Sequence, residues 1–166
     1  MQQEIIMTKQ LSSHAAAAKM IRTHIKSLGI KATVKASSYA YGSSIRAEVH
    51  NVCPAVRKEL KSYVDQFQYA QFDVMTDCYH TTNNRQDIPQ VKFTFLNVTY
   101  SNEIKQKAYE WVREHCSGYK TSSEKFEEVT CWDKSESGQF ITETVYHVLN
   151  GNLSNLAEQF WSTIQG

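Results

Sequence analysis

The stretch from residue 72 to residue 80 holds the side chains of this chain that most resemble a reactive or metal-binding group. Its carboxylates are Asp73 and Asp77, its thiol is Cys78 and its imidazole is His80. Such groups bind zinc, and a Cys/His pair is also the basis of thiol catalysis. Because Cys78 and His80 are two residues apart, they would share a face of a strand, which suits a metal better than a catalytic dyad.

The surrounding sequence does not extend this cluster. No second Cys/His pair follows at zinc-finger spacing, and neither an H-E-x-x-H nor a G-x-S-x-G motif is present. Asp73 and Asp77 are more simply interpreted as capping a turn and the strand that follows it. We therefore predict no bound metal, no cofactor and no enzymatic activity.

A second distinctive stretch is Ser37-Ser38-Tyr39-Ala40-Tyr41-Gly42-Ser43-Ser44, which we expect to be a loop longer than a tight hairpin needs. Its two tyrosines lie beside cations of the flanking strands, and cations next to aromatic rings hold phosphates while the rings stack on bases. The sequence thus predicts a binding surface made of Lys31, Lys35, Tyr39, Tyr41 and Arg46. The alternative is a solvated hairpin whose tyrosines pack on a neighbouring helix.

Composition indicates an ordinary globular chain of 166 residues, with 41% hydrophobic and 21% charged residues. We expect a single domain over residues 1–166, with residues 1–10 forming a loose N-terminal segment. No apolar run approaches the ~20 residues of a membrane span, so no membrane association is expected. Four cysteines without a CxxC pair favour reduced thiols and a cytoplasmic location.

Charge is distributed unevenly along the sequence. Residues 1–60 carry nine Lys/Arg and three Asp/Glu, a net charge of +6, whereas residues 121–166 carry two and seven, a net charge of −5. Such asymmetry is typical of a face that binds a polyanion or of head-to-tail association. It can equally serve solubility alone.

Apolar spacing predicts four amphipathic helices, over residues 13–28, from Pro54, after Ser101 and after Asn152. Alternating patterns predict strands at residues 30–37 and 44–50, a central strand at 91–100 and a short strand at 72–75. Residues 126–132 and 140–149, on either side of a polar turn at 133–138, suggest a hairpin. The predicted fold class is α+β, a mainly antiparallel sheet with four helices in the order α-β-β-α-β-β-α-β-β-α.

Residues 17–80 resemble a known family, the large polyvalent protein-associated domain 29. The matching pieces are Ala18-Lys19-Met20-Ile21-Arg22, Ile30-Lys31-Ala32-Thr33-Val34-Lys35, residues 37–45, and Phe72-Asp73-Val74-Met75-Thr76-Asp77, in which Val74 replaces the family's usual glycine. The resemblance implies a protein of phages or conjugative plasmids that acts in the cytoplasm of a bacterial host cell. It carries over no catalytic residues.

Two functions are consistent with these features. The first is a non-enzymatic phage or plasmid accessory protein that binds a host or element macromolecule. Its partner would be a host defence protein or nucleoprotein complex, and its role that of a counter-defence inhibitor of the anti-CRISPR or anti-restriction type. The alternative is a nucleic-acid-binding module that holds DNA or RNA on the basic N-terminal third.

Overall fold

The computed structural model describes residues 11–116, 123–129 and 140–165. They form an α+β fold, as predicted, and divide into two compact units. Unit 1 contains Met1–Val49 and Leu60–Asn97, and unit 2 contains His50–Glu59 and Val98–Gly166. The predicted loose segment at 1–10 and the predicted turn at 133–138 lie outside the described residues. Whether the two units unfold as a single domain stays a prediction.

Within the described residues, no helix has both the length and the apolar character needed to cross a membrane.

The elements of unit 1 are the helix α1 (Ser13–Ser27), the strands β1 (Ala32–Tyr39), β2 (Gly42–His50), β3 (Ala70–Asp73), β4 (Cys78–Thr81) and β5 (Phe93–Thr99), and the end of the helix α2 (Pro54–Asp65). The boundary between the units falls inside α2, and His50, Val98 and Thr99 belong to unit 2.

The helix α1 forms where the apolar spacing predicts it. Ser12 is its N-cap, and Gly29, with a φ of 70°, follows its end in the left-handed conformation that glycine adopts without strain. Ala17, Ile21 and Ile25 are buried, as expected for one face of a helix. Met20 and Leu28 of the same segment are, by contrast, 38% and 47% exposed.

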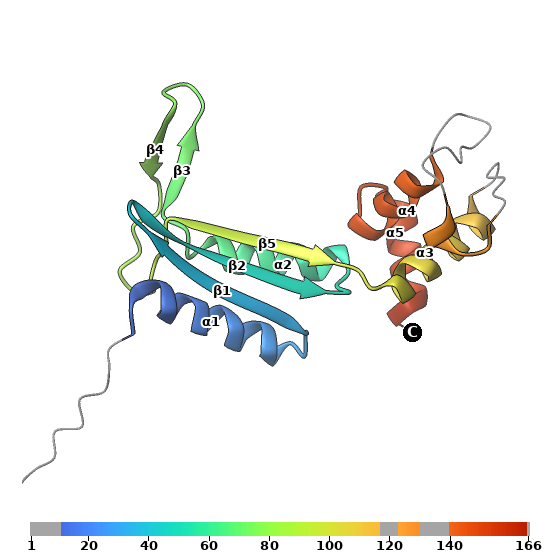
Figure 1. Ribbon diagram of the computed structural model, residues 1–166, viewed down its shortest axis with the longest axis horizontal. Coiled ribbons are helices and arrows are strands. Elements are labelled where there is room, and N and C mark those ends of the chain that lie inside the picture. Colours follow the sequence, from blue (N-terminus) through green and yellow to red (C-terminus); the bar gives the residue numbers. More distant parts are fainter. Residues whose placement is uncertain (1–10, 117–122, 130–139, 166) are drawn as a thin grey trace, which may run out of the picture. The chain divides into compact units, whose positions relative to one another are not determined.

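The sheet of unit 1 has the strand order β1-β2-β5, and β1 is antiparallel to β2. The arrows of β2 and β5 point the same way in Figure 1, so β5 is parallel to β2. The predicted, mainly antiparallel sheet is therefore corrected to a mixed one. The parallel pair is possible because α2 and the β3–β4 hairpin supply the long connection that parallel strands need. The predicted central position of this strand was also wrong, because β2 is central and β5 lies at an end.

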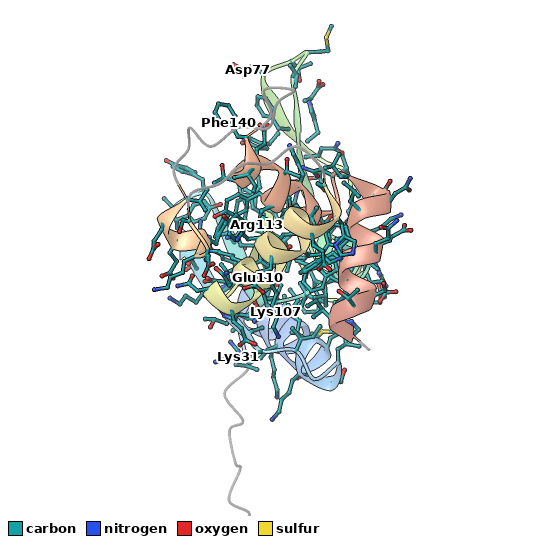
Figure 2. The ribbon with its side chains drawn as sticks, turned by 90° about the vertical axis from the view of Figure 1, so that its right-hand side faces the viewer. Lys31, Asp77, Lys107, Glu110, Arg113 and Phe140 are labelled. Atoms are coloured by element: carbon teal, nitrogen blue, oxygen red, sulfur yellow. The ribbon has the colours of Figure 1, made fainter. Side chains whose placement is uncertain are left out.

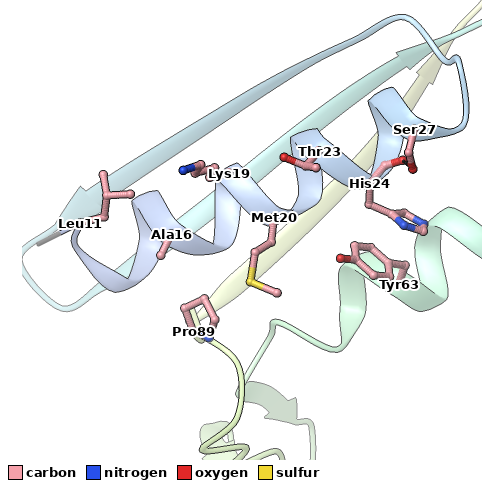
Figure 3. Close-up of a pocket in the computed structure, with 9 residues that line it drawn as sticks. All are labelled: Leu11, Ala16, Lys19, Met20, Thr23, His24, Ser27, Tyr63 and Pro89. Atoms are coloured by element: carbon pink, nitrogen blue, oxygen red, sulfur yellow. Dashed lines mark hydrogen bonds between the residues drawn. The ribbon is translucent and has the colours of Figure 1, made fainter.

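The two faces of this sheet differ strongly. Val34 of β1 and Ile45, Ala47 and Val49 of β2 are buried on one face. The apolar residues of α1 and of the end of α2 (Leu60, Val64) are buried too, and α1 crosses in front of the strands in Figure 3. Residues of opposite parity point the other way. They form what we call the open face: Thr33, Lys35, Ser37, Tyr39, Ser44, Arg46, Glu48, Phe93 and Phe95.

Unit 2 is mainly helical. It contains α3 (Asn102–His115), the short 3-10 helix η1 (Phe126–Glu128), α4 (Ile141–Asn150) and α5 (Ser154–Gln165), and α4 contacts both α3 and α5. Its buried core includes Tyr109, Trp111, Phe160 and Trp161. Tyr100 donates a hydrogen bond from Oη to the carbonyl of Leu149 at 2.8 Å, and burial raises the pKa of this phenol.

The predicted hairpin over residues 126–132 and 140–149 was wrong. Residues 126–128 form η1, residues 130–132 lie outside the described part, and residues 141–150 are the helix α4. Ile141, Thr144, Val145, Val148 and Leu149 are buried, which is the i, i+3, i+4, i+7, i+8 spacing of a helix face. The β-branched residues of this run favour a strand locally, and burial of the apolar face against α3 and α5 overrides that preference.

Candidate functional site

Four aromatic rings form a continuous row in unit 1. Phe93 and Phe95 come from the open face of β5, and Phe72 and Tyr79 come from the β3–β4 hairpin. Neighbouring ring centroids are 5.0 Å apart for Phe72–Tyr79, 5.0 Å for Tyr79–Phe93 and 6.4 Å for Phe93–Phe95. Three of the rings remain 43% to 53% exposed (Phe72, Tyr79, Phe95). We call this row, together with Lys92 and Arg46, the aromatic face.

Two cations lie over these rings. The Nζ of Lys92 is 5.2 Å from the centroid of Tyr79 and 5.5 Å from that of Phe93, and the guanidinium carbon of Arg46 is 5.7 Å from that of Phe95. These are cation–π distances. The aromatic face therefore offers flat apolar surfaces and positive charge at the same place.

The row is held in position by the way the hairpin joins the sheet. Gln68 donates from Nε2 to the carbonyl of Ala70 at 2.7 Å, and its Oε1 accepts from the backbone N–H of Thr94 at 2.8 Å. Asn83 donates to the carbonyls of Gln66 and Gln68. The Asn83 bonds hold the two ends of the hairpin together, and the bond between Gln68 and Thr94 ties the base of the hairpin to β5. Between them lies a groove of about 540 Å³, lined by the four rings and by Gln68, Gln71, Asn83 and Thr94, among others.

The predicted cations Lys35 and Arg46 are direct partners across β1 and β2, and both are exposed. Like charges opposite each other on a sheet face destabilise it. One carboxylate, Glu48, is on the same face, opposite Thr33. A bound anion would relieve the repulsion between Lys35 and Arg46, so this pair favours a phosphate or another anionic ligand.

The predicted tyrosines join the same region from the turn between β1 and β2. Tyr39 is paired with Gly42, and a Cβ added to Gly42 would lie 3.2 Å from the Tyr39 ring and 2.7 Å from Cδ of Lys92. The absence of a side chain at position 42 therefore leaves room for both. Tyr41 is 88% exposed, and its carbonyl accepts a hydrogen bond from Lys92 at 3.4 Å.

Two details of the predicted surface need correction. The connection after Tyr39 is a two-residue turn of Ala40 and Tyr41, not a long loop, because the β1–β2 ladder extends to the Tyr39–Gly42 pair. Lys31 is exposed but precedes the opposite end of β1, about 26 Å from Tyr39 at the usual rise of a strand. Figure 2 likewise shows Lys31 far from Asp77 of the hairpin turn.

Sequence reasoning missed Phe72, Tyr79, Lys92, Phe93 and Phe95 as functional candidates. Phe93 and Phe95 alternate with Thr94 and Leu96, a pattern that also fits a buried central strand. The rings are accessible because they lie on the open face, away from the buried side of the sheet. The hairpin rings are brought to them by the anchoring of Gln68, for which the sequence holds no local signal.

The stretch with Asp73, Cys78 and His80 is the β3–β4 hairpin. Asp73 accepts bonds from the N–H of Met75 at 2.9 Å and from the hydroxyl of Thr76 at 3.0 Å, which confirms that it caps the turn. The Nε2 atom of His80 lies 3.7 Å from Oδ2 of Asp73. No group of three His, Cys, Asp or Glu side chains placed to hold a metal ion is found in the described part of the chain.

A second hollow of unit 1 lies on its helical side. Figure 3 shows it along α1, between Leu11, Met20, His24, Tyr63 and Pro89. The His24 and Tyr63 rings are stacked there with centroids 3.7 Å apart. These two rings are stacked on each other, whereas the tilted or edge contacts of the aromatic face leave Phe72, Tyr79 and Phe95 43% to 53% exposed.

The comparisons with known proteins add no relative. The chain matches no protein-family model, no curated protein and no solved structure. The resemblance of residues 17–80 to the large polyvalent protein-associated domain 29 family therefore stays a prediction.

Proposed function

We propose that this protein is a non-enzymatic binding protein whose aromatic face holds single-stranded DNA or RNA. The observation that carries the proposal is the row of four rings with Lys92 and Arg46 over them. Proteins that bind single strands combine a cationic groove for the phosphates with rings on which bases stack. In unit 1 the four rings line one groove, and Lys92 and Arg46 lie over rings of the same row.

The charge of unit 1 supports the same proposal. By sequence, unit 1 carries ten Lys/Arg and six Asp/Glu, a net charge of +4, whereas unit 2 carries eight and eleven, a net charge of −3. The charge asymmetry of the chain thus follows the division into units. Phosphate contacts supply most of the affinity for nucleic acids and make it depend on salt.

Lys35→Glu is the sharpest test, because its effects on stability and on binding have opposite signs. The substitution converts the like-charge pair with Arg46 into an opposite-charge pair, so we expect the free energy of unfolding to rise by about 0.2–1 kcal/mol. It also removes one cation and adds an anion, so binding to a labelled single strand should weaken and the salt dependence should become shallower.

Urea unfolding and fluorescence anisotropy, with oligo-dT and oligo-U as separate ligands, measure the two effects. Lys26→Glu, an exposed cation on α1, is the matched control and should leave affinity within about twofold apart from the general loss of positive charge. If the wild-type protein binds neither strand at low salt, the proposal is wrong.

A second candidate function rests on the acidic unit 2. Exposed carboxylates lie along α3 at Glu103, Glu110 and Glu114 and on η1 at Glu127 and Glu128. Glu103 pairs with Lys107 at 3.0 Å and Glu128 with Lys125 at 3.6 Å. These groups would suit a basic protein surface that normally faces nucleic acid, as expected of a counter-defence inhibitor from a phage or plasmid. Purification of the tagged chain from bacteria after nuclease treatment tests it, because one stoichiometric protein partner should then remain bound.

A further inference from the structure

The tip of the β3–β4 hairpin exposes two apolar side chains that the fold does not use. Val74 is 82% exposed and Met75 is 93% exposed. Large apolar side chains this open need an explanation when they lie together. They are adjacent in sequence and belong to the turn between β3 and β4, whose residue Asp77 Figure 2 labels at the end of the hairpin.

The tip is a turn held by side-chain hydrogen bonds. Asp73 accepts from Met75 N and from Thr76 Oγ1, and Thr76 Oγ1 lies 3.0 Å from His80 Nε2. Asp77 has a φ of 52°, the left-handed conformation that Asp and Asn tolerate best among non-glycine residues. Specific hydrogen bonds therefore fix the turn that carries Val74 and Met75.

The tip is also continuous with the aromatic face. Phe72 and Tyr79 are partners across the hairpin and point to one side of it, whereas Asp73, Cys78 and His80 have the opposite parity. Phe72, the first ring of the row, is two residues from Val74. A strand lying on the row of rings would thus be led towards the apolar tip.

We infer that Val74 and Met75 act as a wedge against the last base pair where a duplex opens into single strands. Proteins insert apolar side chains between base steps and unstack them, and a terminal pair is stacked on one side only. The wedge would hold this pair open while the released strand follows Tyr79 and Phe93. This inference rests on the proposed function, because it requires that the row of rings binds a single strand.

The test compares three labelled ligands with the full-length protein. They are a single strand of about 16 nucleotides, which is the upper end of the site size of a small single-strand-binding fold, a blunt duplex, and a fork with 2-aminopurine at the junction pair. We expect the fork to bind about tenfold more tightly than the single strand, a preference of ~1.4 kcal/mol. We also expect 2-aminopurine fluorescence to rise, since unstacking relieves its quenching.

Val74→Ser with Met75→Ser should abolish the preference for the fork and the fluorescence rise, while affinity for the single strand stays within about twofold, because both side chains are exposed and stabilise little. Val74→Ile with Met75→Leu is the matched control and should keep both effects. If the wild-type protein binds single strand and fork equally, the wedge is wrong and the proposed function stands. If the wild-type protein binds none of the three ligands, both the wedge and the proposed function are wrong. If an apolar peptide or protein binds the wild type but not the Val74→Ser, Met75→Ser variant, the tip is a protein-docking site instead of a wedge.

Discussion

Replacing Tyr79 and Phe95 together by alanine is expected to weaken binding of single-stranded nucleic acid by about 2–6 kcal/mol, since base–aromatic stacking contributes ~1–3 kcal/mol per ring. The two rings lie on either side of Phe93. Removing Phe95 also takes away the ring under the guanidinium of Arg46. Both rings are about half exposed, so their loss should affect folding much less than binding.

Fluorescence anisotropy with a labelled single strand measures this effect, and far-UV circular dichroism checks that the variant is folded. Tyr146→Ala is the matched control, because Tyr146 of α4 is 43% exposed but belongs to unit 2. It should leave affinity unchanged. A folded Tyr79→Ala, Phe95→Ala protein that binds as tightly as the wild type would remove the aromatic face as the site.

The largest expected effect on stability comes from Trp161→Ala. Trp161 is 5% exposed and belongs to the core of unit 2, with ring contacts to Tyr100 at 6.1 Å and Phe160 at 5.3 Å. Truncation of a buried tryptophan to alanine removes apolar burial and leaves a cavity, so we expect a loss of about 3–5 kcal/mol in the free energy of unfolding. Urea unfolding measures this loss.

Two further variants sharpen the interpretation. Trp161→Phe should lose less, because it keeps a ring and removes an indole N–H that has no hydrogen-bond partner among the described residues. Gln159→Ala changes an exposed position of the same helix and should stay within about 0.5 kcal/mol of the wild type. A loss below ~1 kcal/mol for Trp161→Ala would mean that the core tolerates the cavity, contrary to its burial.

The same experiment tests the prediction of a single domain. Of the three tryptophans, Trp111 and Trp161 are buried in the core of unit 2 and residue 132 lies outside the described residues, while residues 1–49 and 60–97 contain none, so tryptophan fluorescence follows the unfolding of unit 2. Circular dichroism reports helices and strands of both units. If the chain is one cooperative domain, the two transitions coincide and Trp161→Ala shifts them together. A circular dichroism transition that lags behind fluorescence would instead mean that unit 1 folds independently.

The sequence predicted the fold class because its strongest signals are local. The cap and apolar spacing of α1, and the alternation in β1 and β2, depend on neighbouring residues only. The prediction failed at α4, where β-branched residues hide a helical spacing, and at β5, whose place in the sheet depends on a long crossover. Local patterns do not determine strand order, which is set by contacts between residues far apart in sequence.

In the candidate site, too, the part that depends on neighbouring residues was predictable and the part that depends on long-range contacts was not. Lys35, Arg46, Tyr39 and Tyr41 lie close together in sequence, so their grouping was predictable, although Lys31 falls at the far end of β1. The aromatic face was not predictable, because it joins hairpin rings to β5 rings through the side chain of Gln68. A polar residue that ties two segments together carries no periodic signal in the sequence.

The openness of Met75 has a chemical consequence. A thioether that is 93% exposed is accessible to peroxide, whereas Met20 is only 38% exposed. Oxidation would convert the apolar side chain into a polar sulfoxide, a change that methionine sulfoxide reductases reverse. Because the side chain of Met75 contributes little to packing, this lesion would alter the hairpin tip without unfolding the protein. The redox state of a preparation would thus be recorded at Met75, and mass spectrometry measures this oxidation directly.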